Sequence, residues 1–103
     1  MTVSSGYLTA VKTRLRITTT TFDTEITSHI NAAREDLIRL GVRSDVAEDE
    51  TNMSILAAIR AYTLWRFSSD DTLAERSRRD YNDMRDELRR HASYRIEDED
   101  ETS

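Results

Sequence analysis

The hydrophobic positions of this chain are densest in residues 53–67, where eleven of the fifteen residues are apolar or aromatic. Arg60 and Arg66 are the charged residues of this stretch, so only a thin stripe is left for solvent. A helix that is apolar on nearly all sides is a buried helix. At about 1.5 Å per residue it spans roughly 22 Å, and a membrane span needs about 20 apolar residues. The pattern therefore predicts the central core helix of a small domain.

A second, amphipathic helix is predicted between residues 22 and 40. Its apolar positions are three or four residues apart, as one face of a helix requires. They are Phe22, Ile26, Ile30, Ala33, Leu37 and Leu40. Asp23 and Glu25 fall in its first turn and Arg39 in its last, which suits the helix dipole. Gly41 follows and predicts a left-handed C-terminal cap.

A short helix is predicted near the N-terminus. Its apolar face consists of Leu8, Val11 and Leu15. Ser4 or Ser5 is placed to cap it. The β-branched run 17–21 disfavours helix and predicts an extended connector, and the hydroxyl of Thr21 is expected to cap the helix that follows.

The last predicted helix runs from about Asp71 to His91 and is mostly charged. A turn over residues 68–71 ends the central helix and caps this one. Its narrow apolar line, with Ser77 filling a gap, is Leu73, Tyr81, Met84 and Leu88. Opposite charges four residues apart are expected to pair. The pairs are Arg76 with Asp80, Arg79 with Asp83, and Asp86 with Arg90.

Two segments lack helical periodicity. Residues 42–50 are predicted to form a polar loop from which Val42 and Val46 touch the core. After Ala92, Tyr94 and Ile96 are isolated anchors, and the EDEDETS end is expected to be disordered in the free chain.

The predicted fold is all-α, a small bundle of three main helices plus a short N-terminal helix. The helical domain is expected over residues 1–92, followed by an acidic C-terminal tail over residues 93–103, disordered or ordered by a partner. A chain of 103 residues, with no Pro and two Gly, suits one domain of long helices. The expected core contains Leu15, Ile26, Ile30, Leu37, Ile55, Leu56, Ile59, Tyr62 and Trp65.

Charge is unevenly placed along the chain. Five of the twenty acidic residues are consecutive at 97–101, so residues 1–96 carry fifteen acidic and fifteen basic residues and are neutral. The arginines of the last helix alternate with six acids, whereas nucleic-acid binders show a net basic stripe. A solvated, ion-paired face is therefore favoured over a nucleic-acid interface. The acidic end is either a solubilising tail or a segment that orders against a basic partner.

The residue types and spacings do not indicate an enzyme. His29 and His91 are surrounded by no metal-ligand spacing, and the absence of Cys excludes disulfides and thiolate metal sites. Neither a phosphate-binding glycine loop nor a G-x-S-x-G turn is present. We therefore expect no catalytic residue, no cofactor and no metal. The aromatic residues of the central helix, Tyr62, Trp65 and Phe67, fit a core better than a base-stacking platform.

The order of the motifs carries a family resemblance. An opening L-x-x-V-K-x-x-L-R-I over residues 8–17 is followed by a Thr-rich connector and by D-x-E-I-x-x-x-I-x-A-A-R over residues 23–34. An Ala-rich hydrophobic helix over residues 55–65 and a polar, Arg-rich helix come next. Over about residues 7–90 this resembles the head–tail connector, or adaptor, proteins of long-tailed double-stranded DNA viruses of bacteria and archaea.

The resemblance implies a small structural protein of the virion, located at the head–tail junction, or neck, after assembly in the host cytoplasm. Such adaptors form a ring, commonly of twelve copies, on the portal protein, and the ring is the platform for the next neck or tail-completion protein. It extends the channel through which double-stranded DNA leaves without specific binding. No membrane takes part.

Three surfaces are predicted to serve this role. A ring contact needs two different complementary faces, and we expect one of them on the last helix. Its residues are Arg76, Arg79, Arg85 and Arg89. Docking on the portal is assigned to the tail residues Tyr94, Ile96, Glu97, Asp98 and Glu99. Acids of residues 45–50 or of the tail are expected to line the channel and repel DNA.

Two other functions remain open. A small helical DNA-binding regulator is the first alternative, and it predicts a stable dimer. The second is a helical protein–protein module with an unidentified partner.

Overall fold

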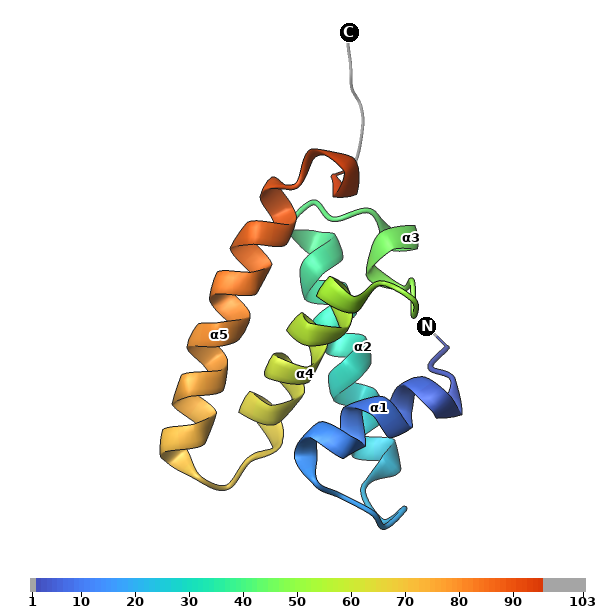
Figure 1. The fold of residues 1–103 in the computed structure, drawn as a ribbon, viewed down its shortest axis with the longest axis vertical. Helices are drawn as coiled ribbons and strands as arrows, with labels where there is room; N and C mark the ends of the chain where they lie inside the picture. Colours follow the sequence, from blue (N-terminus) through green and yellow to red (C-terminus); the bar gives the residue numbers. More distant parts are fainter. Residues whose placement is uncertain (1, 96–103) are drawn as a thin grey trace, which may run out of the picture.

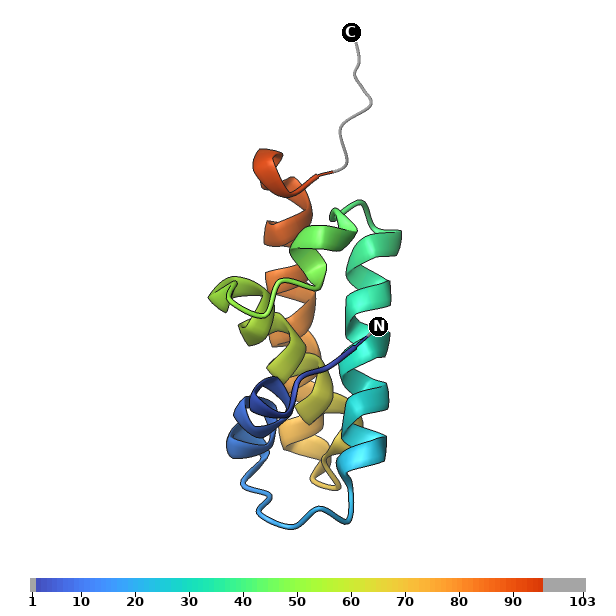
Figure 2. The same ribbon diagram turned by 90° about the vertical axis from the view of Figure 1, so that its right-hand side faces the viewer.

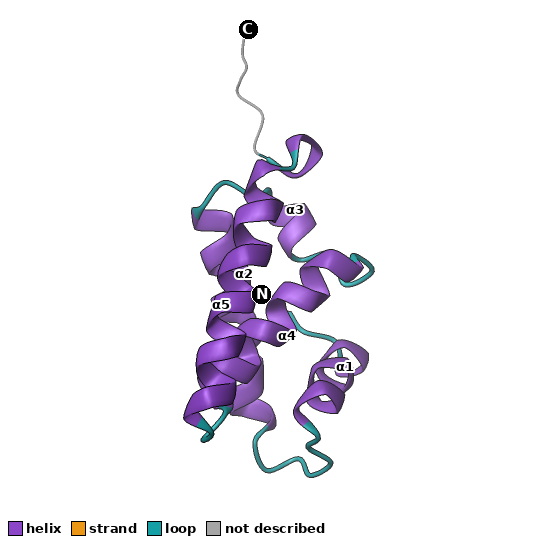
Figure 3. Ribbon diagram, turned by 60° about the vertical axis from the view of Figure 1, so that its left-hand side comes forward, coloured by secondary structure: helices purple, strands orange, loops and turns teal. Residues whose placement is uncertain are grey.

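The computed structural model describes residues 2–95, which are mostly helical (Figure 1). The elements are α1 (Ser5–Leu15), α2 (Asp23–Arg39), α3 (Ser44–Ala47), α4 (Met53–Phe67), α5 (Asp71–Arg90) and a 3-10 turn η1 (Ala92–Tyr94). No strand occurs in this part of the chain, although one antiparallel bridge joins Val42 to Arg95 (Figure 3). The all-α class is confirmed.

Helix α4 lies at the centre, because α1, α2 and α5 all pack against it. In Figure 1, α2 and α5 lead upward and α4 leads downward between them, while α1 lies across the lower half. Figure 2 shows α1 and α2 as separate layers joined by the 16–22 connector. The bounds of α4 match the predicted residues 53–67. Its first turn is fixed by Asn52, whose side chain accepts a hydrogen bond from the Ile55 N–H at 3.1 Å.

Six of the nine predicted core residues are at most 5% exposed. They are Ile26, Ile30, Leu37, Ile55, Leu56 and Ile59. Leu15, Tyr62 and Trp65 are partly buried and pack against this cluster. The Tyr62 ring meets the rings of Trp65 and Tyr81 edge to face, with centroids 5.4 and 5.1 Å away. These aromatic rings therefore pack against one another at the border of the core.

Three predicted helix ends are confirmed. The Ser4 hydroxyl accepts from the Tyr7 N–H at 3.1 Å and caps α1, and Asp70 caps α5 through the Leu73 N–H at 3.0 Å. Gly41, with φ of +109°, ends α2, as predicted for a left-handed residue. Local side-chain and glycine chemistry thus fixes these ends.

Two predictions about connecting segments are wrong. Thr21 does not cap α2, because its N–H and hydroxyl bond to the Thr19 hydroxyl, and Phe22 occupies the cap position without a side-chain bond. Residues 42–50 are not simply a loop, because α3 forms within them. Val46 and Ala47 are the buried residues of this turn of helix, and their burial stabilises it. The predicted contact of Val42 and Val46 with the core is confirmed.

The predicted four-residue ion pairs on α5 are also wrong. The pairs present within α5 join Glu75 with Arg78 and with Arg79, and Asp86 with Arg85 and with Arg89. Residues three apart are neighbours on a helix, as are residues four apart, so a long arginine side chain can reach a carboxylate at either spacing.

Candidate assembly surfaces

A buried arginine on α2 joins three segments that are distant in the sequence. Arg34 is 0% exposed, and its guanidinium donates to the Thr2 carbonyl at 2.9 Å and to Glu50 at 3.4 Å. The same group lies over the Tyr7 ring, 5.2 Å from its centroid. The N-terminal segment, α1 and the segment before α4 are therefore all held by one side chain.

Glu50 is bonded from two sides and is therefore not free to line a channel. It accepts from the Ser4 N–H at 3.0 Å and from the Ser4 hydroxyl, and these hydrogen bonds, with Arg34, lower the pKa of Glu50. Asp45 pairs with Arg43, and Asp49 accepts from Thr51. Among the acids of residues 45–50, Glu48 is exposed and has no bonded partner within the described residues.

A second polar contact joins α2 to α5 beside α4. The Tyr81 hydroxyl donates to Asp36 at 2.6 Å, and the Tyr81 side chain is 1% exposed. Burial, followed by this hydrogen bond to Asp36, raises the pKa of Tyr81 far above its usual range. Arg85 lies 3.9 Å from Asp36 and places its guanidinium over the Tyr81 ring. This contact fixes the side of α5 that faces α2.

Arg43 holds the C-terminal segment against the end of α2. Its N–H donates to the Tyr94 carbonyl at 2.7 Å and its guanidinium donates to the Ser93 carbonyl at 3.0 Å. The Tyr94 ring stacks on His91 with centroids 4.1 Å apart. Tyr94, assigned from the sequence to a docking tail, thus packs on the helical body. The other assigned tail residues, Ile96, Glu97, Asp98 and Glu99, lie outside the described residues.

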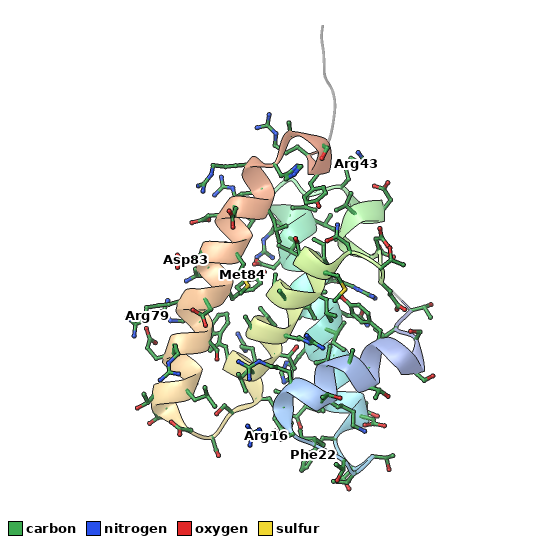
Figure 4. The ribbon with its side chains drawn as sticks, viewed as in Figure 1. Arg16, Phe22, Arg43, Arg79, Asp83 and Met84 are labelled. Carbon is green, nitrogen blue, oxygen red and sulfur yellow. The ribbon has the colours of Figure 1, made fainter. Side chains whose placement is uncertain are left out.

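The four arginines predicted to form one ring face lie on different sides of α5. Arg79 points away from the bundle, as does Asp83 (Figure 4). Arg85 is 29% exposed and faces α2, with Arg89 one turn further along the same side. Arg76 lies about 140° around the helix from Arg89, at about 100° per residue. The structure therefore brings Arg85 and Arg89 together and separates Arg76 and Arg79 from them.

A groove lies between α4 and α5. It consists of two hollows of about 330 and 170 Å³, both lined by Ala57 of α4 and Met84 of α5. Met84 is drawn toward α4 in Figure 4. Glu87 and Tyr94 line the larger hollow, and Asp80 and Arg14 line the smaller one. An apolar floor with charged edges can accept a segment of another chain.

Sequence reasoning missed the roles of Arg34 and Arg43. A signal for Arg34 is present, because it lies four residues after Ile30 and three before Leu37, on the apolar face of α2. Arg43 gives no such signal, since its carbonyl partners lie fifty residues further along the chain.

The described residues contain no group of three or more His, Cys, Asp or Glu side chains that could hold a metal ion. No helix within residues 2–95 is long and apolar enough to cross a membrane.

Comparison with protein families identifies the chain. A model of the family described as phage connector protein matches residues 7–95. The chain belongs to the phage connector protein family. Comparison with curated proteins gives no match, and comparison with solved structures gives none.

Membership makes this connector a structural protein of the phage head–tail junction, in a family that is structural and not catalytic. The predicted resemblance is confirmed over nearly all of the described residues.

Proposed function

We propose that this connector assembles as a ring between the portal and the next neck or tail-completion protein, and that the ring extends the DNA exit channel. The observation that carries the proposal is the family match over residues 7–95, which includes every helix except the first two residues of α1. We set the number of copies at twelve, the usual number for adaptors of this kind. A closed ring needs two unlike faces on each copy.

One of these faces is the side of α5 that carries Arg85 and Arg89. Both guanidiniums are partly exposed, at 29% and 49%, while Asp36 and Asp86 hold them in place. Arginines that are already oriented lose less side-chain entropy when a partner binds. This supports a contact between copies at this side of α5.

We assign the acidic C-terminal tail of the connector to docking on the portal. We place its boundary after Arg95, because Ser93 and Tyr94 are bonded to Arg43 and belong to the helical body. Five consecutive acids at 97–101 suit a basic surface on the portal. A chain ending at Arg95 should keep its helical circular dichroism and lose portal binding. Unchanged portal affinity would remove this assignment.

The channel is assigned an acidic lining in the assembled ring. Glu48, exposed at the end of α3, and the acids of the tail are the candidates, because Asp45 and Glu50 are bonded within the chain. Like charges repel the phosphate backbone and let DNA slide. Assembled rings should retain DNA weakly at all salt concentrations. Strong, salt-dependent retention would contradict this lining.

The deciding experiment is light scattering coupled to size exclusion, on the connector alone and mixed with the portal protein of the same virus. The proposal expects a monomer alone and a high-order ring with the portal. A discrete dimer that ignores the portal would reject the ring and favour the DNA-binding regulator.

A further inference from the structure

The first helix is attached to the rest of the chain by a small apolar contact and four polar contacts. We call residues 2–15, which comprise α1 and the segment before it, the arm. Its apolar contact is centred on Tyr7 and Val11, the buried residues of α1. The polar contacts join Thr2 to Arg34, Ser4 to Glu50, Ala10 to Arg60 and Lys12 to Asp23, with atoms 2.9, 3.0, 3.0 and 2.7 Å apart. Polar groups at fixed places therefore determine how the arm is bound.

The polar partners of the arm form a socket that requires an arm. Its residues are Asp23, Arg34, Glu50 and Arg60. Arg34 is 0% exposed, and the arm supplies the Thr2 carbonyl that it binds and the Tyr7 ring that it covers. A buried charge that loses a partner destabilises a fold strongly. The arm of a second copy carries the same groups and would fill the socket with the same contacts.

The connector between α1 and α2 can be extended by breaking local contacts alone. It comprises residues 16–22, which are exposed apart from the partly buried Ile17. Its hydrogen bonds, in the described part of the chain, join residues 12–26 to one another. Arg16 has a φ of +60°, in the left-handed region that disfavours a residue with a Cβ, and extension removes this strain. Phe22, the last residue of the connector, can keep its contact with Phe67 of α4.

The extended connector is long enough to reach a neighbouring copy. The peptide units from Leu15 to Phe22 span about 23–25 Å when extended. The molecule measures 28 and 18 Å along its two shorter axes, so a copy packed beside it lies within this reach. Figure 2 shows α1 and α2 as separate layers, with the connector crossing between them at one end of the bundle. The arm can therefore be exchanged while the other helices stay packed.

We propose that, in the ring, the arm of each copy fills the socket of the next copy. This exchange gives every copy two unlike parts, an arm and a socket, and the ring closes when the last arm fills the first socket. The contacts of the arm are the same in the free chain and in the ring, so the two states differ mainly in the connector. The portal brings copies together and raises the effective concentration of sockets, which favours exchange. The exchange rests on the proposed ring function and adds to the contact at Arg85 and Arg89.

Cross-linking of introduced cysteines tests the exchange, because the chain has no Cys of its own. The test variant carries Lys12→Cys, in the arm, with Asp23→Cys, in the socket, and a short bismaleimide joins the two thiols. The control carries Glu75→Cys with Arg79→Cys, an exposed ion pair on α5 whose two residues always belong to one chain. Thermal unfolding checks that both variants are folded.

Rings assembled on the portal are cross-linked, denatured and separated by SDS gel electrophoresis. We expect the test variant to give covalent multimers from rings and single chains from the free connector, whereas the control gives single chains from both. Rings that give only single chains would overturn the exchange and leave the ring function intact.

Locking the arm before assembly gives a second readout. The test variant, cross-linked as a free monomer and then mixed with the portal, should lose at least tenfold in ring formation measured by light scattering, and the cross-linked control should assemble as wild type does. A locked test variant that assembles normally would overturn the exchange. Wild type that forms no ring would reject the ring function itself. If the test variant unfolds early, Ser4→Cys with Glu50→Cys gives both readouts.

Discussion

The buried Arg34 gives the sharpest test of how the N-terminal half is held together. Replacing Glu50 by Gln keeps the size of the side chain and removes the charge that faces Arg34. A hydrogen bond to a charged group is worth about 1.5–3 kcal/mol. Because the Glu50 side chain is 29% exposed and lies 3.4 Å from Arg34, we expect a smaller loss, of about 1–1.5 kcal/mol.

The same substitution in an Arg34→Met background isolates the pair. Methionine keeps most of the buried volume and has no charge, so the loss caused by Glu50→Gln should then be smaller, and what remains is the part due to the two Ser4 hydrogen bonds. Urea unfolding followed by circular dichroism at pH 7 measures all four proteins. Equal losses in the two backgrounds would show that Arg34 and Glu50 act independently and would refute the pairing.

Three further predictions concern stability. Gly41→Ala should lower the free energy of unfolding by about 1–2 kcal/mol, because φ of +109° strains any residue with a Cβ. Gly6→Ala, on the exposed face of α1, should raise the free energy of unfolding by about 0.5–1 kcal/mol. Tyr81→Phe should cost about 1–2 kcal/mol through the lost bond to Asp36. The folded-state pKa of Glu50 lies below its unfolded value, so its contribution to the free energy of unfolding is complete above about pH 4.5 and is lost as pH falls further. Glu50→Gln should therefore make the free energy of unfolding less dependent on pH in this acid range.

Urea midpoints test the glycine and tyrosine substitutions, and acid titrations test the pH dependence. A Gly41→Ala protein as stable as wild type would show that the glycine conformation is not required. A Tyr81→Phe protein of unchanged stability would show that Asp36 is equally well solvated without the phenol. If the free energy of unfolding of Glu50→Gln falls as steeply with decreasing pH as that of wild type, other carboxylates cause the pH dependence.

The helices were predictable because their signals are local. The fifteen-residue apolar run gives α4, and Asp70 and Gly41 mark helix ends through bonds or backbone angles within a few residues. The helix α3 was missed because its stability comes from burial of Val46 against distant residues, and a four-residue helix has no periodicity to detect.

The assembly surfaces were less predictable than the fold. Composition correctly showed that α5 mixes both charges, but its arginines were grouped without regard to where each lies around the helix. The partner of Arg85 is Asp36, on another helix, and that contact decides which side of α5 faces α2. Position around α5 becomes known only when the buried side, marked by Tyr81 and Leu88, is known.

The contacts of Arg43 determine where tension on the C-terminus would be borne. The Ser93 and Tyr94 carbonyls are held by the residue that follows Val42, and Val42 is bridged to Arg95. A pull applied beyond Arg95 would therefore load the junction of α2 and α3 and its buried Val42 before it could unwind the last turn of α5. A force on the C-terminus would thus be transmitted to the middle of the chain, at the end of the helix that carries Arg34.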